Sequence, residues 1–254
     1  MPTTNRKYPG VLLASPQSCQ SCSVRPHTLY RHFRDEALDI VQDYRLCQTQ
    51  LPAKRKIFVE GQSGTHAYTL YSGCVAVYKS LPNGKRQILR FALPGDFLGF
   101  QSQLDSPMLC SAVALSPVIL CAFSRPQLKQ FLEQDPNLAR ELALFNVRES
   151  ELCHYHLMLT GRQSARERIA FLLLEIYYRS KNRGLVTSPG TIPFPISQED
   201  IADAAGLTTV HVNRTLRQMK ESGLVDRAGR SLVLQKRKEL SDISSFDRQI
   251  FDNH

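Results

Sequence analysis

Seven cysteines are the residues of this 254-residue chain with the widest choice of chemistry. Cys19 and Cys22 are separated by two residues, and a pair at this spacing can form a disulfide on oxidation. The pair could also help to bind zinc, but no second Cys/His pair follows at zinc-binding spacing. An odd cysteine count without a secretion signal indicates a reducing compartment and free thiols. Four others are expected to be ordinary core residues: Cys47, Cys74, Cys110 and Cys153.

A basic segment near the C-terminus offers a second kind of chemistry. Residues 205–238 hold eight Lys and Arg against two Asp and Glu, so +6 of the chain's net charge of +9 lies within them. Each phosphate that a protein neutralises releases counterions, and such a concentration of positive charge therefore indicates a polyanionic partner. A scaffold that used its helices for protein contacts alone would not explain this concentration.

The same segment has the pattern of a helix-turn-helix with a wing. Ser197 and Thr208 are placed to cap helices over about 198–205 and 209–221, while Gly206 and Gly223 end them. Two short apolar strands on either side of the turn 228–230 predict a hairpin. The pattern therefore predicts binding to double-stranded DNA.

The second of these helices would present its first turns to the major groove. Asn213 can pair with adenine and Arg214 with guanine, and Val210 can contact a thymine methyl group. His211 and Arg217 are expected nearer the phosphates. The candidate DNA contacts are Ser197, Thr208, Thr209, Val210, His211, Asn213, Arg214, Arg217 and Lys220, although helix capping alone would explain Ser197 and Thr208.

The elements before this segment predict a β domain followed by helices. Short β-branched and aromatic runs from about residue 52 to 123 are separated by turn residues, as in a sandwich or barrel. A short helix is expected within 29–51, on the spacing of Leu38, Val41, Tyr44 and Leu46. Another begins at the capping box Ser164-x-x-Glu167.

A helix of roughly five turns after Pro136 carries a narrow apolar seam. Such a seam favours dimerisation over packing against the chain's own β domain. The seam is formed by Leu138, Leu142, Phe145, Leu152, His156 and Leu159.

Other classes of protein are disfavoured by composition. An apolar content of 42% is enough for a sizeable core, and no apolar run approaches the ~20 residues of a membrane span. The N-terminus is too weakly apolar for a signal peptide, which favours the cytoplasm. A β-barrel oxygenase would need a His/His/carboxylate set, whereas His66 stands alone among histidines in the β section, so we expect no enzyme.

This order of parts resembles the Crp/Fnr family of bacterial transcription regulators. The resemblance covers about residues 19–238 and is most specific in LPGDFLGF (93–100), SARERIAFLL (164–173) and 196–225. It implies an α+β fold and a homodimer that binds a roughly palindromic operator and contacts RNA polymerase. The implied parts are an N-terminal arm (1–28), a jelly-roll, cyclic-nucleotide-binding-like β-roll sensor domain (29–125), a dimerisation helix region (126–161), a winged helix-turn-helix domain (162–240) and a tail (241–254).

Two departures from the family pattern stand out. Relatives usually place Glu at the position of Val210, where it reads cytosine, so an unusual half-site is expected. The cyclic-nucleotide branch carries an Arg-Ser pair for the cyclic phosphate, whereas the equivalent stretch 106–115 has no arginine. Cyclic AMP is therefore not an expected ligand.

Fnr-type relatives hold a [4Fe-4S] cluster through four cysteines. Cys19 and Cys22 match two of them and Cys121 matches the ligand from the β domain, but Tyr30 occupies the remaining position. A cluster with His27 or solvent as fourth ligand, a redox-active pair and a remnant of a lost cluster all stay open. The regulator would thus respond to oxygen or redox state, or act without any cluster, either independently of ligand or in response to a small molecule.

Overall fold

The computed structural model describes residues 8–101, 106–187, 190–248 and 251. The chain divides into two compact units. Unit 1 contains residues 1–84 and 90–150, and unit 2 contains 85–89 and 151–254.

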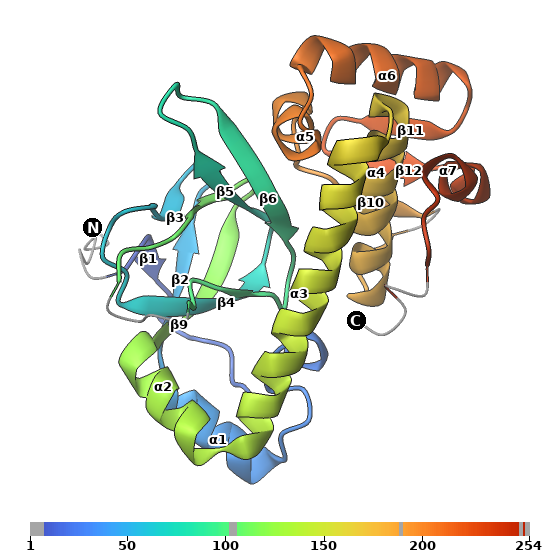
Figure 1. The fold of residues 1–254 in the computed structure, drawn as a ribbon. Helices are drawn as coiled ribbons and strands as arrows, with labels where there is room; N and C mark the ends of the chain where they lie inside the picture. The colour runs from blue at the N-terminus through green and yellow to red at the C-terminus, as the bar shows by residue number, and fades with distance from the viewer. Residues whose placement is uncertain (1–7, 102–105, 188–189, 249–250, 252–254) are drawn as a thin grey trace. The chain divides into compact units, whose positions relative to one another are not determined.

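Two antiparallel sheets form the β-roll (Figure 1). One has the strand order β1-β2-β9-β4-β7 and the other β3-β8-β5-β6. Their bounds are β1 Val11–Leu12, β2 Arg45–Leu51, β3 Lys56–Phe58, β4 His66–Ser72, β5 Val75–Ser80, β6 Arg86–Ala92, β7 Phe97–Leu98, β8 Ser111–Ala114 and β9 Val118–Ser124. The expected β section is confirmed.

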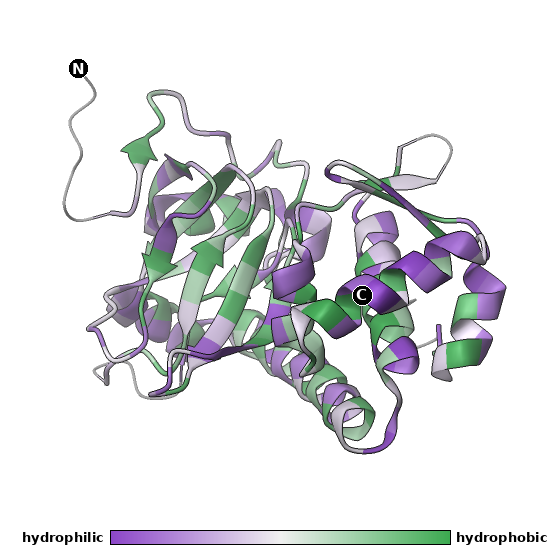
Figure 2. Cartoon of the chain, turned by 90° about the horizontal axis from the view of Figure 1, so that it is seen from above, coloured by the Kyte–Doolittle hydropathy of each residue, from purple (hydrophilic) through white to green (hydrophobic). Residues whose placement is uncertain are grey.

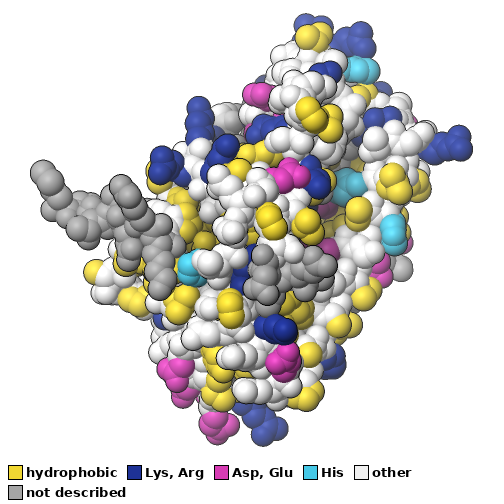
Figure 3. Space-filling model, turned by 60° about the vertical axis from the view of Figure 1, so that its left-hand side comes forward, with side chains coloured by type: hydrophobic (Ala, Val, Ile, Leu, Met, Phe, Trp, Pro, Cys, Tyr) yellow, Lys and Arg dark blue, Asp and Glu magenta, His cyan; other side chains and the backbone are white. Residues whose placement is uncertain are grey.

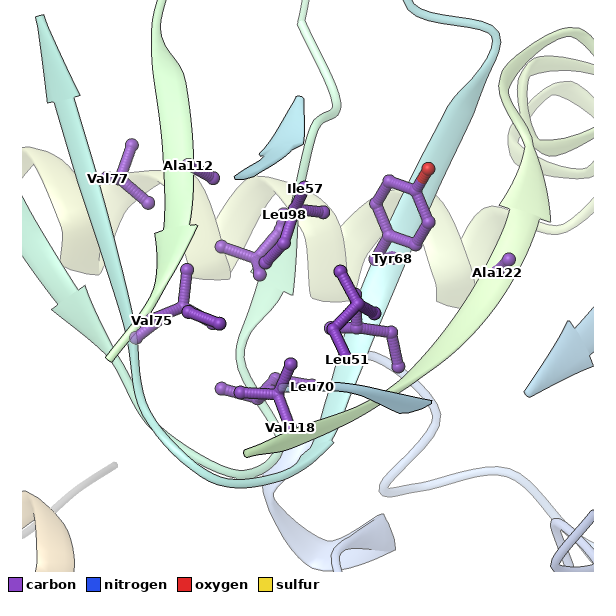
Figure 4. Close-up of a cluster of buried hydrophobic side chains, with 13 residues drawn as sticks. Leu51, Ile57, Tyr68, Leu70, Val75, Val77, Leu98, Ala112, Val118 and Ala122 are labelled. Carbon is purple, nitrogen blue, oxygen red and sulfur yellow. The ribbon is translucent and has the colours of Figure 1, made fainter. Parts of the chain in front are cut away.

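The core of the roll lies between these sheets. Leu70 of β4, Val75 of β5 and Leu120 of β9 are fully buried there. Figure 4 shows Leu51, Leu70, Val75 and Val118 pointing into a shared interior, and Figure 2 shows hydrophobic and hydrophilic residues mixed along the strands. Side chains alternate between the faces of a strand, which is why one half of each strand can fill this core. Gly84 has φ 81° in the β5–β6 turn, a conformation that glycine adopts without strain.

The helix expected within 29–51 is shorter than its spacing predicted. Helix α1 spans Asp35–Tyr44, and Leu46 lies in strand β2 instead. Arg45 already has extended backbone angles, and its strand pairs with β9 across 6 registered positions. Pairing with a strand far along the chain therefore overrides the local helical spacing. A single 3-10 turn, η1 (Arg25–His27), precedes α1.

Two helices follow the roll. Helix α2 spans Arg125–Gln134, and helix α3 spans Pro136–Arg162. The Asp135 carboxylate accepts hydrogen bonds from the backbone N–H groups of Asn137 and Leu138, which stabilises the start of α3. With 27 residues, α3 is about 40 Å long and continues from unit 1 into unit 2.

Unit 2 is built around helix α4 (Ala165–Asn182), which begins with the expected Ser164/Glu167 capping box. It further contains α5 (Gln198–Ala205), α6 (Thr209–Glu221), α7 (Arg237–Ser244) and a sheet of order β10-β12-β11. The strands are β10 Thr191–Pro193, β11 Val225–Ala228 and β12 Ser231–Leu234. Phe171 of α4 packs edge-on against Phe246, which stacks on Phe251. None of the helices described here has the length and hydropathy to cross a membrane.

Candidate DNA-binding interface and cysteine cluster

Helices α5 and α6 have the bounds that their capping residues predicted. The Ser197 hydroxyl accepts from the Asp200 N–H at 3.0 Å, and the Ser197 backbone N–H donates to Asp200 Oδ2 at 2.8 Å, which completes a capping box. Gly206 ends α5 with φ 66°, and Thr208 then caps α6 by accepting from the His211 N–H at 3.3 Å. The hydroxyl groups of Ser197 and Thr208 thus stabilise the starts of the two helices. Contacts of these hydroxyl groups with DNA stay a prediction.

Helix α6 separates buried and exposed residues cleanly. Val212, Thr215 and Met219 are buried, whereas Val210 is 80% exposed. Figure 3 shows Lys and Arg side chains on this part of unit 2, at the top of the view. The exposed face brings together Thr209, Val210, Asn213, Arg214, Arg217 and Lys220, with His211 half-buried beside them.

The polar groups of this face are held loosely. Lys220 Nζ lies 3.1 Å from Asp226, and Arg217 Nε lies 3.9 Å from Glu221. Both pairs are exposed, and such pairs contribute little free energy, so either cation can exchange its carboxylate for a phosphate. Within the described chain, Arg214 has no ion pair or hydrogen bond through its side chain.

Two residues that the sequence analysis did not single out support this face. Gln198 Oε1 accepts a hydrogen bond from Asn213 Nδ2 at 3.0 Å, which orients an amide expected to read a base. The position of Gln198 in the first turn of α5 was the sequence feature that could have indicated this role. Arg227 of the wing donates through Nη2 to Ile196 O at 2.6 Å and lies 5.3 Å from the centre of the Phe194 ring. Nothing local in the sequence indicated that anchoring role.

The three matching cysteines of the N-terminal half lie together. Cys19, Cys22 and Cys121 line one pocket of about 30 Å³, together with Tyr30. Gln48 Nε2 donates to Cys121 Sγ at 3.2 Å, and Arg45 Nη1 lies 3.8 Å from Cys19 Sγ. The resemblance therefore identified residues that are neighbours in space, although Cys19 and Cys22 come from the arm and Cys121 comes from strand β9.

The electrostatics of this cluster favour protonated groups. Burial raises the pKa of Cys121 to about 11, with Gln48 acting in the opposite direction. Burial also raises the pKa of Cys19, against the lowering effect of Arg45. Burial raises the pKa of Tyr30 as well, and the nearby Cys19 and Cys121 add to that. Tyr30 Oη is buried without a hydrogen-bond partner in the described structure.

A four-iron cluster does not fit the cysteine pocket in this conformation. A volume of about 30 Å³ is roughly that of one water molecule. The Tyr30 ring fills the position of the missing ligand and packs 5.7 Å from Phe33 and 5.8 Å from Phe123, measured between ring centres. Nor do the described residues contain a group of three or more His, Cys, Asp or Glu placed to hold a single metal ion. His27 does not line the pocket.

The structure places most of the expected dimer seam against the chain's own residues, and its role in dimerisation stays a prediction. Leu138, Leu152 and Leu159 are at most 8% exposed because the chain's own residues cover them. Leu142 and Phe145 are half-buried against the core of unit 1, and His156 contacts Glu175 of α4. Helical spacing identifies an apolar helix face, but it does not tell whether the same chain or a partner chain covers that face. The exposed apolar residues of α3 are instead Leu144, Val147, Leu157 and Met158.

A β-roll, a long helix and a winged helix-turn-helix with a basic exposed face together define a DNA-binding protein with a separate sensor-like unit. Comparison with known proteins agrees. Residues 48–135 match the cyclic nucleotide-binding domain model, and residues 167–243 match the Crp-like helix-turn-helix domain model. The chain belongs to the Crp/Fnr family and is a DNA-binding transcription regulator.

Its relatives include two curated regulators and a solved structure. The nitrogen fixation regulation protein FixK of Bradyrhizobium diazoefficiens is 32% identical over 85% of this chain and 90% of its own length. The transcriptional activatory protein AadR of Rhodopseudomonas palustris is 34% identical over 68% of this chain and 70% of its own. The structure of FixK2 from Bradyrhizobium japonicum has a TM-score of 0.71 at 29% identity, covering 79% and 98% of the two chains.

Proposed function

We propose that this regulator acts as a cytoplasmic homodimer on a roughly palindromic operator and contacts RNA polymerase to change transcription. The observation that carries the proposal is the exposed face of α6, where Asn213 and Arg214 stand beside the cations Arg217 and Lys220. Asn and Arg read base edges bidentately, and the cations neutralise phosphates. A two-fold symmetric dimer would place two such helices on the two halves of a palindrome.

The exposed apolar row of α3 supports dimerisation. Leu144, Val147 and Met158 lie within about 60° of one another around the helix axis, and Leu157 lies about 80° further round from Val147, on a side that the chain itself leaves open. A row of this length fits a second copy of the same helix, because an isologous contact uses the same surface on both partners. In this proposal the homodimer uses this exposed side of α3.

Val210 sets the expected operator apart from the family's usual half-site. Its isopropyl group is 80% exposed near the start of α6, where side chains reach base edges. Valine offers no hydrogen-bond acceptor to a cytosine, but it can contact a thymine methyl group. We expect thymine or adenine-thymine pairs to be preferred at this position.

We propose an oxygen or redox signal for unit 1. A relative from Aggregatibacter actinomycetemcomitans, 24% identical, is named an anaerobic regulatory protein, and one from Escherichia coli a fumarate and nitrate reduction regulatory protein. The clustered thiols of Cys19, Cys22 and Cys121 support such a signal. All three are free thiols here, so oxidation can join two of them. The alternative is a regulator whose DNA binding does not depend on the oxidation state of these thiols.

The DNA-binding proposal is tested by selecting operators from random duplexes and then comparing variants. Arg214→Ala should weaken specific binding by about 1–3 kcal/mol and relax the preference at one base pair. Lys220→Ala should weaken binding to all sequences more evenly and flatten the salt dependence. Unchanged affinity and base preference for Arg214→Ala would refute this placement of α6.

The redox proposal needs a separate measurement. Operator affinity is compared for reduced protein and for protein treated with a mild thiol oxidant, each in wild type and in Cys19→Ser/Cys22→Ser. A change that the double variant abolishes supports the thiol signal. Equal affinities in all four samples would favour regulation independent of these thiols.

A further inference from the structure

An open cavity of about 300 Å³ lies in unit 2 between α6 and the wing. Its floor includes Leu173 of α4, Ile201 of α5 and Leu232 of β12, all of them buried. Its volume is that of roughly ten water molecules, which is the low end of the range for small-molecule sites. A helix-turn-helix does not need such a space in order to fold.

The charged residues around this cavity favour an anion. Arg217, Lys220 and Arg227 line it beside the neutral amides of Gln198 and Asn213, and no Asp or Glu of the described chain does. Arg227 is half-buried, and it uses one of its five N–H donors in the hydrogen bond to Ile196 O. A partly desolvated guanidinium binds a carboxylate more strongly than an exposed one, and can do so through two parallel hydrogen bonds. Burial also lowers the pKa of Arg227, with Asp200 acting against that.

We propose that this cavity binds a small organic acid, with its apolar body on the leucine-rich floor and its carboxylate at Arg227. An acid of about ten non-hydrogen atoms matches the volume. Because Asn213 and Arg217 line the same cavity and are predicted DNA contacts, the acid and DNA exclude each other. This last step rests on the proposed DNA-binding function, while acid binding itself does not.

The cations of this site can bind either the carboxylate of an organic acid or a phosphate of DNA. The two sources differ in the apolar body, which only the organic acid can place on the floor of the cavity. Octanoate tests the first source and a random-sequence duplex tests the second. The full-length protein is used throughout.

The experiment is photolabelling with a diazirine derivative of octanoic acid, followed by peptide mapping. Saturable labelling of peptides from α6 or the β11–β12 hairpin, blocked by unlabelled octanoate and by duplex DNA, is the expected result. Arg227→Gln should lower labelling about tenfold, because it removes the charged half of the carboxylate contact. The matched control is Arg230→Gln, an exposed arginine of the same wing outside the cavity lining, which should label normally.

Leu216→Trp provides a second variant that keeps every charge and fills the cavity from α6. It should also lose labelling while keeping its thermal unfolding transition. Labels scattered over the chain, or equal labelling of folded Arg227→Gln and Arg230→Gln, would overturn the site. Labelling that duplex DNA does not block would overturn the mutual exclusion. A chain that labels correctly but binds no DNA would instead refute the proposed function.

Discussion

His156 Nε2 of α3 lies 2.8 Å from Glu175 Oε2 of α4, and the other oxygen of the same carboxylate accepts from Arg179 Nη1 at 3.0 Å. Glu175 and Arg179 are almost fully buried. Burial alone would raise the pKa of Glu175, but His156 and Arg179 outweigh it and lower that pKa to about 2. This contact ties the C-terminal half of α3 to the helix on which unit 2 is built.

Glu175→Gln should destabilise unit 2 strongly. The substitution removes a buried carboxylate charge that pairs with Arg179 and His156, and breaking such a buried pair costs about 3 kcal/mol or more. Urea unfolding followed by circular dichroism measures the loss. Glu221→Gln is the matched control, because Glu221 has the same four-residue spacing from Arg217 but is exposed, and it should cost less than about 0.5 kcal/mol. Equal losses for the two variants would contradict this account.

The same carboxylate should make stability sensitive to acid. Its pKa is lower in the folded chain than in the unfolded chain, where it is about 4.3. Its contribution is therefore complete above that unfolded value and declines as the pH falls toward 2. The difference in unfolding free energy between wild type and Glu175→Gln should narrow over this range. A constant difference would mean that the charge of Glu175 is not what stabilises the contact.

Leu157→Glu should convert the homodimer into monomers. Leu157 is 72% exposed on α3, so the change should leave the fold of one chain intact while placing two carboxylates in the interface. Light scattering coupled to size exclusion measures the mass. Leu81→Glu replaces an equally bulky exposed residue in the β5–β6 turn and should remain dimeric. A dimeric Leu157→Glu would move the interface to another surface.

Tyr30→Cys should allow an iron–sulfur cluster to form at the cysteine pocket. The change supplies a fourth thiol and removes the ring that now fills the space beside Cys19 and Cys121. Iron, acid-labile sulfide and the visible spectrum are measured after anaerobic reconstitution. Wild type and Tyr30→Phe should stay colourless and iron-free. Stoichiometric iron and sulfide in wild type would show that the pocket opens to accept a cluster despite Tyr30.

Local signals explain which features the sequence predicted well. Ser197, Gly206 and Thr208 determine the ends of α5 and α6 through contacts within a few residues, so the helix-turn-helix was predicted to the residue. Leu46 was misplaced because pairing between β2 and β9 is decided by residues some 70 positions apart. The burial of Leu138, Leu152 and Leu159 by the chain's own residues could not be predicted, because spacing does not say what covers a helix face. The convergence of Cys19, Cys22 and Cys121 came from resemblance, since no local pattern brings β9 to the arm.

Because α3 is one unbroken helix, the directions of its side chains around the helix axis are fixed relative to one another. Each residue of an α-helix advances the direction of its side chains by about 100°. Leu144 and Val147 belong to unit 1 and Met158 to unit 2, yet the three fall within about 60° around the helix axis because no break interrupts the helix between them. One residue inserted after Ser150 would turn the second half of the row away from the first, whereas seven residues would nearly restore the alignment. Helical phase along α3 therefore sets which of its own residues point to the same side.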